Sequence, residues 1–154
     1  MKKSTNKKYK SYEEGSIYHI NYGRTFHPEL KAKHLGVLFP ISSTENMIFC
    51  LPLTSPKEKH FKTLEGYNNR NHNDLKYSHL YYIKETDSII LMEQFRTISK
   101  NRIESQYKDV KTNQKVVLSE LELSKIKVAF NKFIKTIIKW INHFVLSNIL
   151  LECG

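Results

Sequence analysis

The chain has 154 residues, 40% hydrophobic and 26% charged, and this length predicts one domain, or one domain with an appendage. Its composition excludes a fully disordered chain, and the absence of any apolar stretch of about 18 residues predicts no transmembrane helix. The 25 Lys and Arg against 15 Asp and Glu give a net charge of +10, which favours a polyanionic partner, with nucleic acid as the first candidate. A proteome that is rich in lysine throughout would explain the same excess.

The N-terminal residues 1–14 carry five lysines and two glutamates, and they predict a basic flexible tail. No apolar segment follows these basic residues, so a secretory signal is not expected. Cys50 and Cys153 lie far apart in the sequence and indicate neither a disulfide framework nor a zinc site. A reduced, cytoplasmic setting is therefore expected, and Cys50, inside an apolar segment, is expected to pack rather than react.

Short apolar or alternating segments predict five strands before residue 93. They are Ser16–Tyr22, Leu35–Phe39, Met47–Leu53, Ser78–Lys84 and Ser88–Met92. Three residues separate the last two segments, which predicts a hairpin. The stretch Thr54–Tyr77, rich in Lys, Asn, Gly and His, reads as a long surface loop with room for a short helix, and such loops often carry function.

The C-terminal third predicts one long helix. Ser119 and Glu122 form a capping-box pattern, and apolar residues then recur at helical spacing from Ile126 to Val145. We expect this helix, over 119–150, to pack on the preceding domain or to lie at an oligomer or partner interface. Its lysines also suit a membrane surface, but the strands favour a globular scaffold. The whole pattern predicts an α+β fold, a small SH3-like barrel over 15–118 with a long C-terminal helical segment.

Two stretches carry side chains suited to phosphodiester chemistry. In the first, the apolar strand ends in Thr54 and Ser55, followed by Lys57, and hydroxyls with a cation at a strand end can hold a phosphate. In the second, Lys31 and Lys33 precede His34, whose imidazole titrates near neutral pH and can move protons. An ordinary Ser-Pro turn and a histidine that anchors a strand are the structural alternatives.

No spacing typical of metal ligands and no Gly-rich phosphate loop occurs in the sequence, so no metal and no cofactor are expected.

Four segments, in order, resemble motifs of the MazF/PemK (Kid) family of toxin endoribonucleases. Gly15–Tyr22 resembles the family's opening strand, Glu29–Leu38 its second motif and Leu51–Ser55 its x-P-I/L-T/S strand end. The most specific match is ILMEQFRTISKNRI, Ile90–Ile103, which is similar to L-x-x-Q-x-R-T-I-D-K-x-R-L. The run PLTSPK is also similar to the ToxN toxins, whose antitoxin is an RNA. His34 stands where the family usually has its catalytic arginine.

The resemblance implies the toxin component of a toxin–antitoxin system. Its activity would be sequence-selective, metal-independent cleavage of single-stranded RNA by 2′-OH transesterification. Its partners would be RNA, a protein or RNA antitoxin and a second copy in a homodimer, for which the broad apolar stripe of the helix also argues, with no membrane involved.

Together with the two stretches above, the resemblance assigns roles to particular residues. His34, Thr54, Ser55 and Glu93 are the expected catalytic residues, with His27 as a second candidate for proton transfer. The expected RNA-binding residues are Lys31, Lys33, Lys57 and Gln94, with Tyr22 and Phe26 stacking on bases or, alternatively, packing in the core.

Two classes of protein without catalysis stay open. One is a barrel that binds a protein or DNA, like the gyrase-poisoning CcdB toxins, and the other is a nucleic-acid or membrane-surface adaptor. Incubation of the protein with RNA in EDTA distinguishes the nuclease from both.

Overall fold

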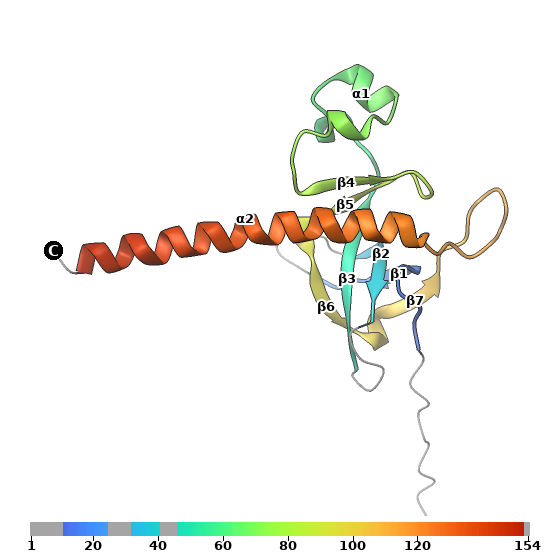
Figure 1. Ribbon diagram of the computed structural model, residues 1–154. Helices are drawn as coiled ribbons and strands as arrows, with labels where there is room; N and C mark the ends of the chain where they lie inside the picture. Colours follow the sequence, from blue (N-terminus) through green and yellow to red (C-terminus); the bar gives the residue numbers. More distant parts are fainter. Residues whose placement is uncertain (1–10, 25–31, 41–45, 153–154) are drawn as a thin grey trace, which may run out of the picture.

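The computed structural model describes residues 11–24, 32–40 and 46–152 (Figure 1). Within these residues, seven strands form one open antiparallel sheet in the order β4-β5-β3-β2-β1-β7, with β6 also paired to β3. The strands are β1 (Ile17–Asn21), β2 (Lys33–Phe39), β3 (Met47–Thr54), β4 (Leu80–Ile83), β5 (Ser88–Leu91), β6 (Arg96–Ser99) and β7 (Ile103–Gln106). A long helix, α2 (Glu120–Glu152), follows the sheet, so the predicted α+β class is confirmed.

The five predicted strands are β1 to β5, with ends that differ by at most two residues from the expected ones. The predicted hairpin is also confirmed, since β4 and β5 pair antiparallel with Tyr81 opposite Ile90. Sequence reasoning missed β6 and β7. Each has only four residues, and only Ile98 in β6 and Ile103 in β7 are buried, so neither carries a readable apolar pattern.

Strand β3 is the centre of the sheet because it has three partners. Along one edge it pairs with β2, and along the other its first half, Met47–Cys50, pairs with β6 while Leu53 and Thr54 pair with β5. Pro52 lies between those two halves, where the missing N–H of proline interrupts no ladder with β5 or β6. This change of partner brings the turn between β5 and β6 close to β3.

The expected long loop after β3 contains short helical pieces, namely η1 (Glu58–His60), α1 (Leu64–Asn68) and η2 (His72–Asp74). Asp74 holds the segment together, because its carboxylate accepts hydrogen bonds from the backbone N–H and the hydroxyl of Thr63 at 3.0 and 2.7 Å. Phe61 anchors the segment on the sheet by packing in one cluster with Leu80 and Ile89. The segment is therefore folded against β4 and β5, as Figure 1 shows.

The main core lies between the sheet and the first third of α2. Leu123 and Ile126 are buried there, and the Phe130 ring lies 5.5 Å from that of Phe49 and 5.3 Å from that of Phe95. Ser119 caps the helix as predicted, since its hydroxyl accepts the N–H of Glu122 at 3.2 Å.

The rest of α2 projects beyond the sheet (Figure 1). The large apolar side chains from Ile138 to Leu146 are exposed there, Trp140 by 72%. The broad apolar stripe predicted from the sequence is thus covered by the sheet along only part of its length.

Residues 1–10 of the predicted tail lie outside the described residues. The following residues contact the domain: Tyr12 packs edge-on against Tyr18, and Glu14 forms an ion pair with Lys127 of α2 at 2.6 Å. None of the helices in the described part of the chain has both the length and the apolar character needed to cross a membrane.

Candidate functional site

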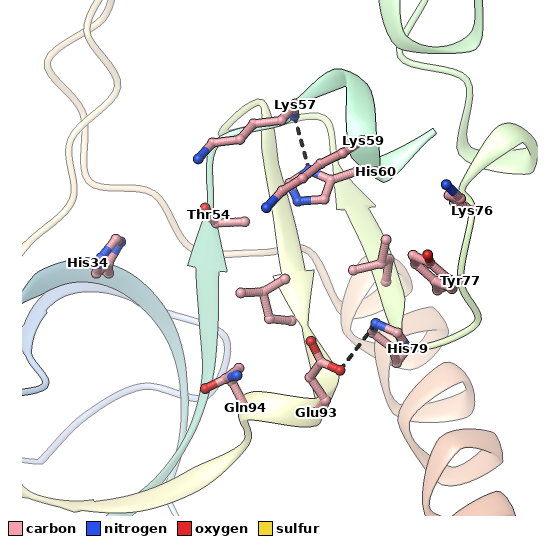
Figure 2. Close-up of a pocket in the computed structure, with 12 residues that line it drawn as sticks. His34, Thr54, Lys57, Lys59, His60, Lys76, Tyr77, His79, Glu93 and Gln94 are labelled. Carbon is pink, nitrogen blue, oxygen red and sulfur yellow. Dashed lines mark hydrogen bonds and ion pairs between the residues drawn. The ribbon is translucent and has the colours of Figure 1, made fainter. Parts of the chain in front are cut away.

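A pocket of about 520 Å³ opens where β2, the end of β3, η1, the start of β4 and the turn after β5 meet (Figure 2). Five of the residues predicted from the sequence line it, together with seven others. The predicted ones are His34, Thr54, Lys57, Glu93 and Gln94, and the others are Lys59, His60, Lys76, Tyr77, His79, Leu80 and Leu91. The pocket thus combines three histidines, three lysines and one carboxylate, which is a set suited to a phosphate and to proton transfer.

His34 enters the pocket from β2, where it pairs with Ile20 of β1 and is half-buried. Beneath it the Tyr22 ring lies 6.4 Å from the imidazole, with the two ring planes tilted by 49°. Ala32, two residues before His34, has a φ of 65°, a left-handed conformation that costs a non-glycine residue free energy. The strand that carries His34 therefore begins at a strained position.

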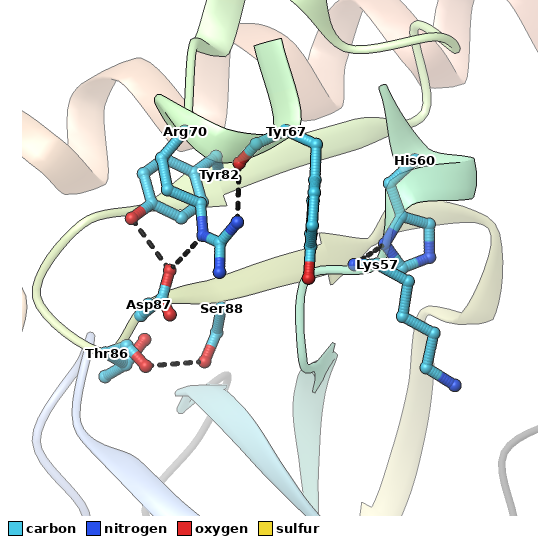
Figure 3. Close-up of polar contacts among 8 residues, drawn as sticks. All are labelled: Lys57, His60, Tyr67, Arg70, Tyr82, Thr86, Asp87 and Ser88. Carbon is cyan, nitrogen blue, oxygen red and sulfur yellow. Dashed lines mark hydrogen bonds and ion pairs between the residues drawn. The ribbon is translucent and has the colours of Figure 1, made fainter. Parts of the chain in front are cut away.

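Thr54 ends β3 and is followed by Lys57, whose backbone N–H donates to Nδ1 of His60 at 3.0 Å (Figures 2 and 3). His60 itself is only 8% exposed. Burial, with Lys59 and Lys57 adding to it, lowers the pKa of His60 below the ordinary 6.5, so the ring is neutral at neutral pH and Nδ1 stays an acceptor. His60 thereby fixes the turn that presents Lys57.

His79 and Glu93 form an ion pair across the pocket, with 3.3 Å between Nε2 and Oε2 (Figure 2). The pairing of the hairpin explains this contact. The N–H of Met92 donates to the carbonyl of His79 at 3.0 Å, which places the following residue, Glu93, beside the imidazole. The His79 ring also stacks on Tyr77, with centroids 5.2 Å apart and planes 11° from parallel. His79 is thus held on two sides, and a carboxylate orients its imidazole.

The remaining predicted residues lie elsewhere. Ser55 is exposed next to Thr54 and does not line the pocket. Lys33 points away from it and pairs with Glu104 of β7 at 3.0 Å. Phe26, His27 and Lys31 lie outside the described residues, so their predicted roles stay predictions.

Tyr22 takes the alternative role predicted from the sequence and packs in the core, because it is 3% exposed and leaves no ring face open to a base. Its hydroxyl shares a hydrogen bond of 3.1 Å with the buried Cys50 thiol, and the Arg96 guanidinium lies 5.1 Å from the ring centroid. Burial raises the pKa of Cys50 to about 12, so the thiol stays protonated and is no nucleophile. Tyr22 and Cys50 thus pack together in the core beside β2.

Sequence reasoning missed the functional candidates His60, His79 and Lys76. They lie in or just after the Lys- and His-rich stretch that was predicted as a functional loop, and this composition was the available signal. Their positions could not be predicted because each depends on how that loop folds back on the hairpin.

The neutral state of His60 predicts a dependence of stability on pH. The unfolded chain binds a proton at this residue as pH falls through its ordinary pKa of 6.5, whereas the native chain binds it only at lower pH. Stability should therefore decrease from about pH 7.5 to about pH 5.5, as measured by urea unfolding.

His60→Gln, whose side-chain oxygen can still accept the N–H of Lys57, should show a smaller decrease. Part of the decrease should remain, because partial desolvation of the ring beside Tyr81 also lowers the pKa of His72. His143→Gln changes an exposed histidine of α2 and should behave as the wild type. An unchanged pH dependence in His60→Gln would contradict a neutral His60.

No three or more His, Cys, Asp or Glu side chains within 11–24, 32–40 and 46–152 are grouped so that they could hold a metal ion. No protein-family model matches the chain, and a search of curated proteins finds no significant match. The likeness to the MazF and PemK toxins therefore stays a prediction from the sequence motifs.

Proposed function

We propose that this protein is an endoribonuclease that needs no metal ion and cleaves single-stranded RNA by transesterification, as the toxin of a toxin–antitoxin pair. The observation that carries the proposal is the pocket itself. Residues chosen from three separate sequence motifs, His34, Thr54 with Lys57, and Glu93 with Gln94, line one cavity. A pocket with three lysines and a single carboxylate suits a phosphodiester.

The reaction needs a base, an acid and a group that stabilises charge on the phosphoryl oxygens. The base removes the proton of the ribose 2′-OH, whose oxygen then bonds to phosphorus. The bond from phosphorus to the 5′ oxygen breaks, and the acid gives this oxygen a proton. The products are a 2′,3′-cyclic phosphate and a 5′-OH end.

In the proposal, His34 is one of the two proton-transfer groups, and the pair of His79 and Glu93 provides the other from the hairpin side. An imidazole held by a carboxylate suits this task, because the carboxylate orients the ring toward the reacting group. The hydroxyl of Thr54 and the ammonium of Lys57 contact the phosphoryl oxygens, and Gln94 contacts the RNA.

The proposal extends to the fold and to the partners. The sheet, in which the central strand β3 pairs with three other strands, is compatible with an SH3-like barrel of the MazF/PemK type. The exposed apolar face of α2 between Ile138 and Leu146 supports a homodimer or a complex with an antitoxin, because large apolar patches of this kind mark interaction sites.

The decisive experiment is incubation of the purified protein with a single-stranded RNA of mixed sequence in excess EDTA. Because side chains provide proton transfer and charge stabilisation in the proposal, cleavage should persist and should leave 5′-OH ends. A polynucleotide kinase labels such ends directly without phosphatase treatment, which is the measurement. Loss of cleavage in EDTA with recovery in Mg²⁺, or 5′-phosphate products, would contradict the mechanism.

The control for contaminating nuclease is Thr54→Ala, purified in the same way, which should cleave more slowly because it lacks the hydroxyl at the phosphate. RNA binding without cleavage by the wild type would favour the class of barrel proteins that only bind.

A further inference from the structure

A second hollow shares strand β4 with the candidate site. It has a volume of about 780 Å³ and is bounded by residues 70–72, by β4 with the following turn, and by the first half of α2. Leu80 lines the candidate site and its neighbour Tyr81 lines this α2 hollow. The edge strand β4 therefore contributes side chains to both cavities.

The α2 hollow is basic. Lys84 reaches it from the hairpin turn, and Lys125 and Lys132 reach it from α2. All three lysines are exposed, and within the described part of the chain none of them forms an ion pair. Glu122 is the one carboxylate among the residues that line this cavity. Arg70 also lines the hollow but is paired with Asp87, so the three lysines against one carboxylate remain, and this excess favours an anionic ligand.

The wall of the α2 hollow also carries rings on a fixed frame. The exposed His72 packs edge-on against Tyr81, with ring centroids 4.6 Å apart. Tyr81 is only 6% exposed and supports His72, so His72 and the half-buried Tyr82 are the rings open to a base. Tyr82 donates its hydroxyl proton to Asp87 at 3.0 Å, and the same carboxylate oxygen accepts from Nε of Arg70 at 2.9 Å (Figure 3). This network holds the loop at Arg70 against the hairpin and fixes the Tyr82 ring.

Cations beside aromatic rings form the kind of surface that binds single-stranded nucleic acid, because phosphates pair with the cations and bases stack on the rings. We propose that the α2 hollow is a second RNA contact, which holds the strand that continues from the candidate site around the edge of β4. This inference rests on the proposed function for the identity of the ligand. It adds that recognition extends beyond the cleaved bond onto α2.

The test measures binding apart from cleavage. The probe is a fluorescein-labelled 2′-O-methyl RNA of about 16 nucleotides, a length within the range that single-strand binding folds cover, which lacks the attacking hydroxyl and cannot be cleaved. Fluorescence anisotropy gives its Kd for the wild type and for the triple variant Lys84→Gln, Lys125→Gln and Lys132→Gln. The matched control is Lys108→Gln, Lys111→Gln and Lys115→Gln, which removes the same charge from the exposed segment before α2.

We expect the triple variant of the α2 hollow to bind RNA about tenfold more weakly than the control variant. The slope of log K against log salt concentration should also become smaller in magnitude by about 2, because three phosphate contacts are lost. His72→Ala, which removes a ring without changing a lysine, should also weaken binding, whereas His143→Ala should not. Circular dichroism checks that each variant is folded. If the triple variant does not fold, the Kd of His72→Ala tests the proposal instead.

Equal Kd values for the two triple variants would overturn the inference, since the effect would then be one of net charge alone. So would the absence of binding by the wild type at low salt. Cleavage of unmodified RNA by the wild type is measured separately. A protein that binds through the α2 hollow but does not cleave would refute the nuclease and leave the second contact intact.

Discussion

His34→Ala should lower RNA cleavage by about 10²–10⁴-fold, the loss expected when a general acid or base is removed. The residue lines the pocket from β2 and faces the hydroxyl and lysine side chains at the end of β3. His34→Arg separates two roles. If the imidazole transfers a proton, arginine should restore little activity, because its guanidinium does not titrate near neutral pH. If the ring supplies only charge, arginine should restore activity.

The matched control is His19→Ala. His19 is a half-buried strand histidine of β1 that packs near Tyr107 and does not line the pocket, so cleavage should be retained. Initial rates with a fluorescent RNA and circular dichroism spectra are measured for all three variants. Full activity in a folded His34→Ala would remove His34 from the active site and leave His79 with Glu93 as the main candidates.

Gly36→Ala should destabilise the protein by about 3 kcal/mol, at the upper end for an added core methyl group. A Cβ at this position would lie 2.5 Å from Sγ of Cys50 and 2.6 Å from both Cδ1 of Ile20 and the Tyr22 hydroxyl oxygen. All three partners are buried in one cluster, and close packing of a protein interior opposes their displacement. For a chain of this length, the melting temperature should fall by about 6–12 °C.

The same substitution should reduce cleavage below the melting temperature, because β2 carries both Gly36 and His34 and must shift to admit the methyl group. Tyr22→Phe and Cys50→Ala each remove one of the close contacts. Either should therefore cost less in the Gly36→Ala background than in the wild type, a coupling that a double-mutant cycle measures. A Gly36→Ala protein with wild-type stability would contradict the close packing of Cys50, Ile20 and Tyr22 around Gly36.

Local patterns in the sequence were sufficient to predict β1 to β5, the hairpin and α2. Each of these elements has an apolar periodicity within its own residues, such as the alternation in 16–22 and the helical spacing from Ile126 to Val145. For the same reason β6 and β7 were missed, since strands with one buried residue each have no periodicity to read. These strands exist because neighbouring strands pair with them.

Part of the candidate site followed from residue chemistry. Hydroxyls and a lysine at the end of a predicted strand pointed to Thr54 and Lys57, and an imidazole beside cations pointed to His34; all three line the pocket. Chemistry alone does not distinguish an exposed ring from a buried one. The sequence therefore left Tyr22 with two possible roles, stacking on RNA or packing in the core, and in the fold it packs in the core.

The composition and periodicity of this chain thus determine its basic charge, its strands and its long helix, because these depend on residues close together in the sequence. The partners of each functional group were decided by the register of the folded sheet. His79 meets Glu93 because the backbone pairing of β4 and β5 continues beyond the ends of the two strands, to His79 and Met92. The turn after β5 reaches β3 because β3 changes partner at Pro52. Contacts of this kind join residues from different strands, and their free energy depends on the whole sheet rather than on any single segment.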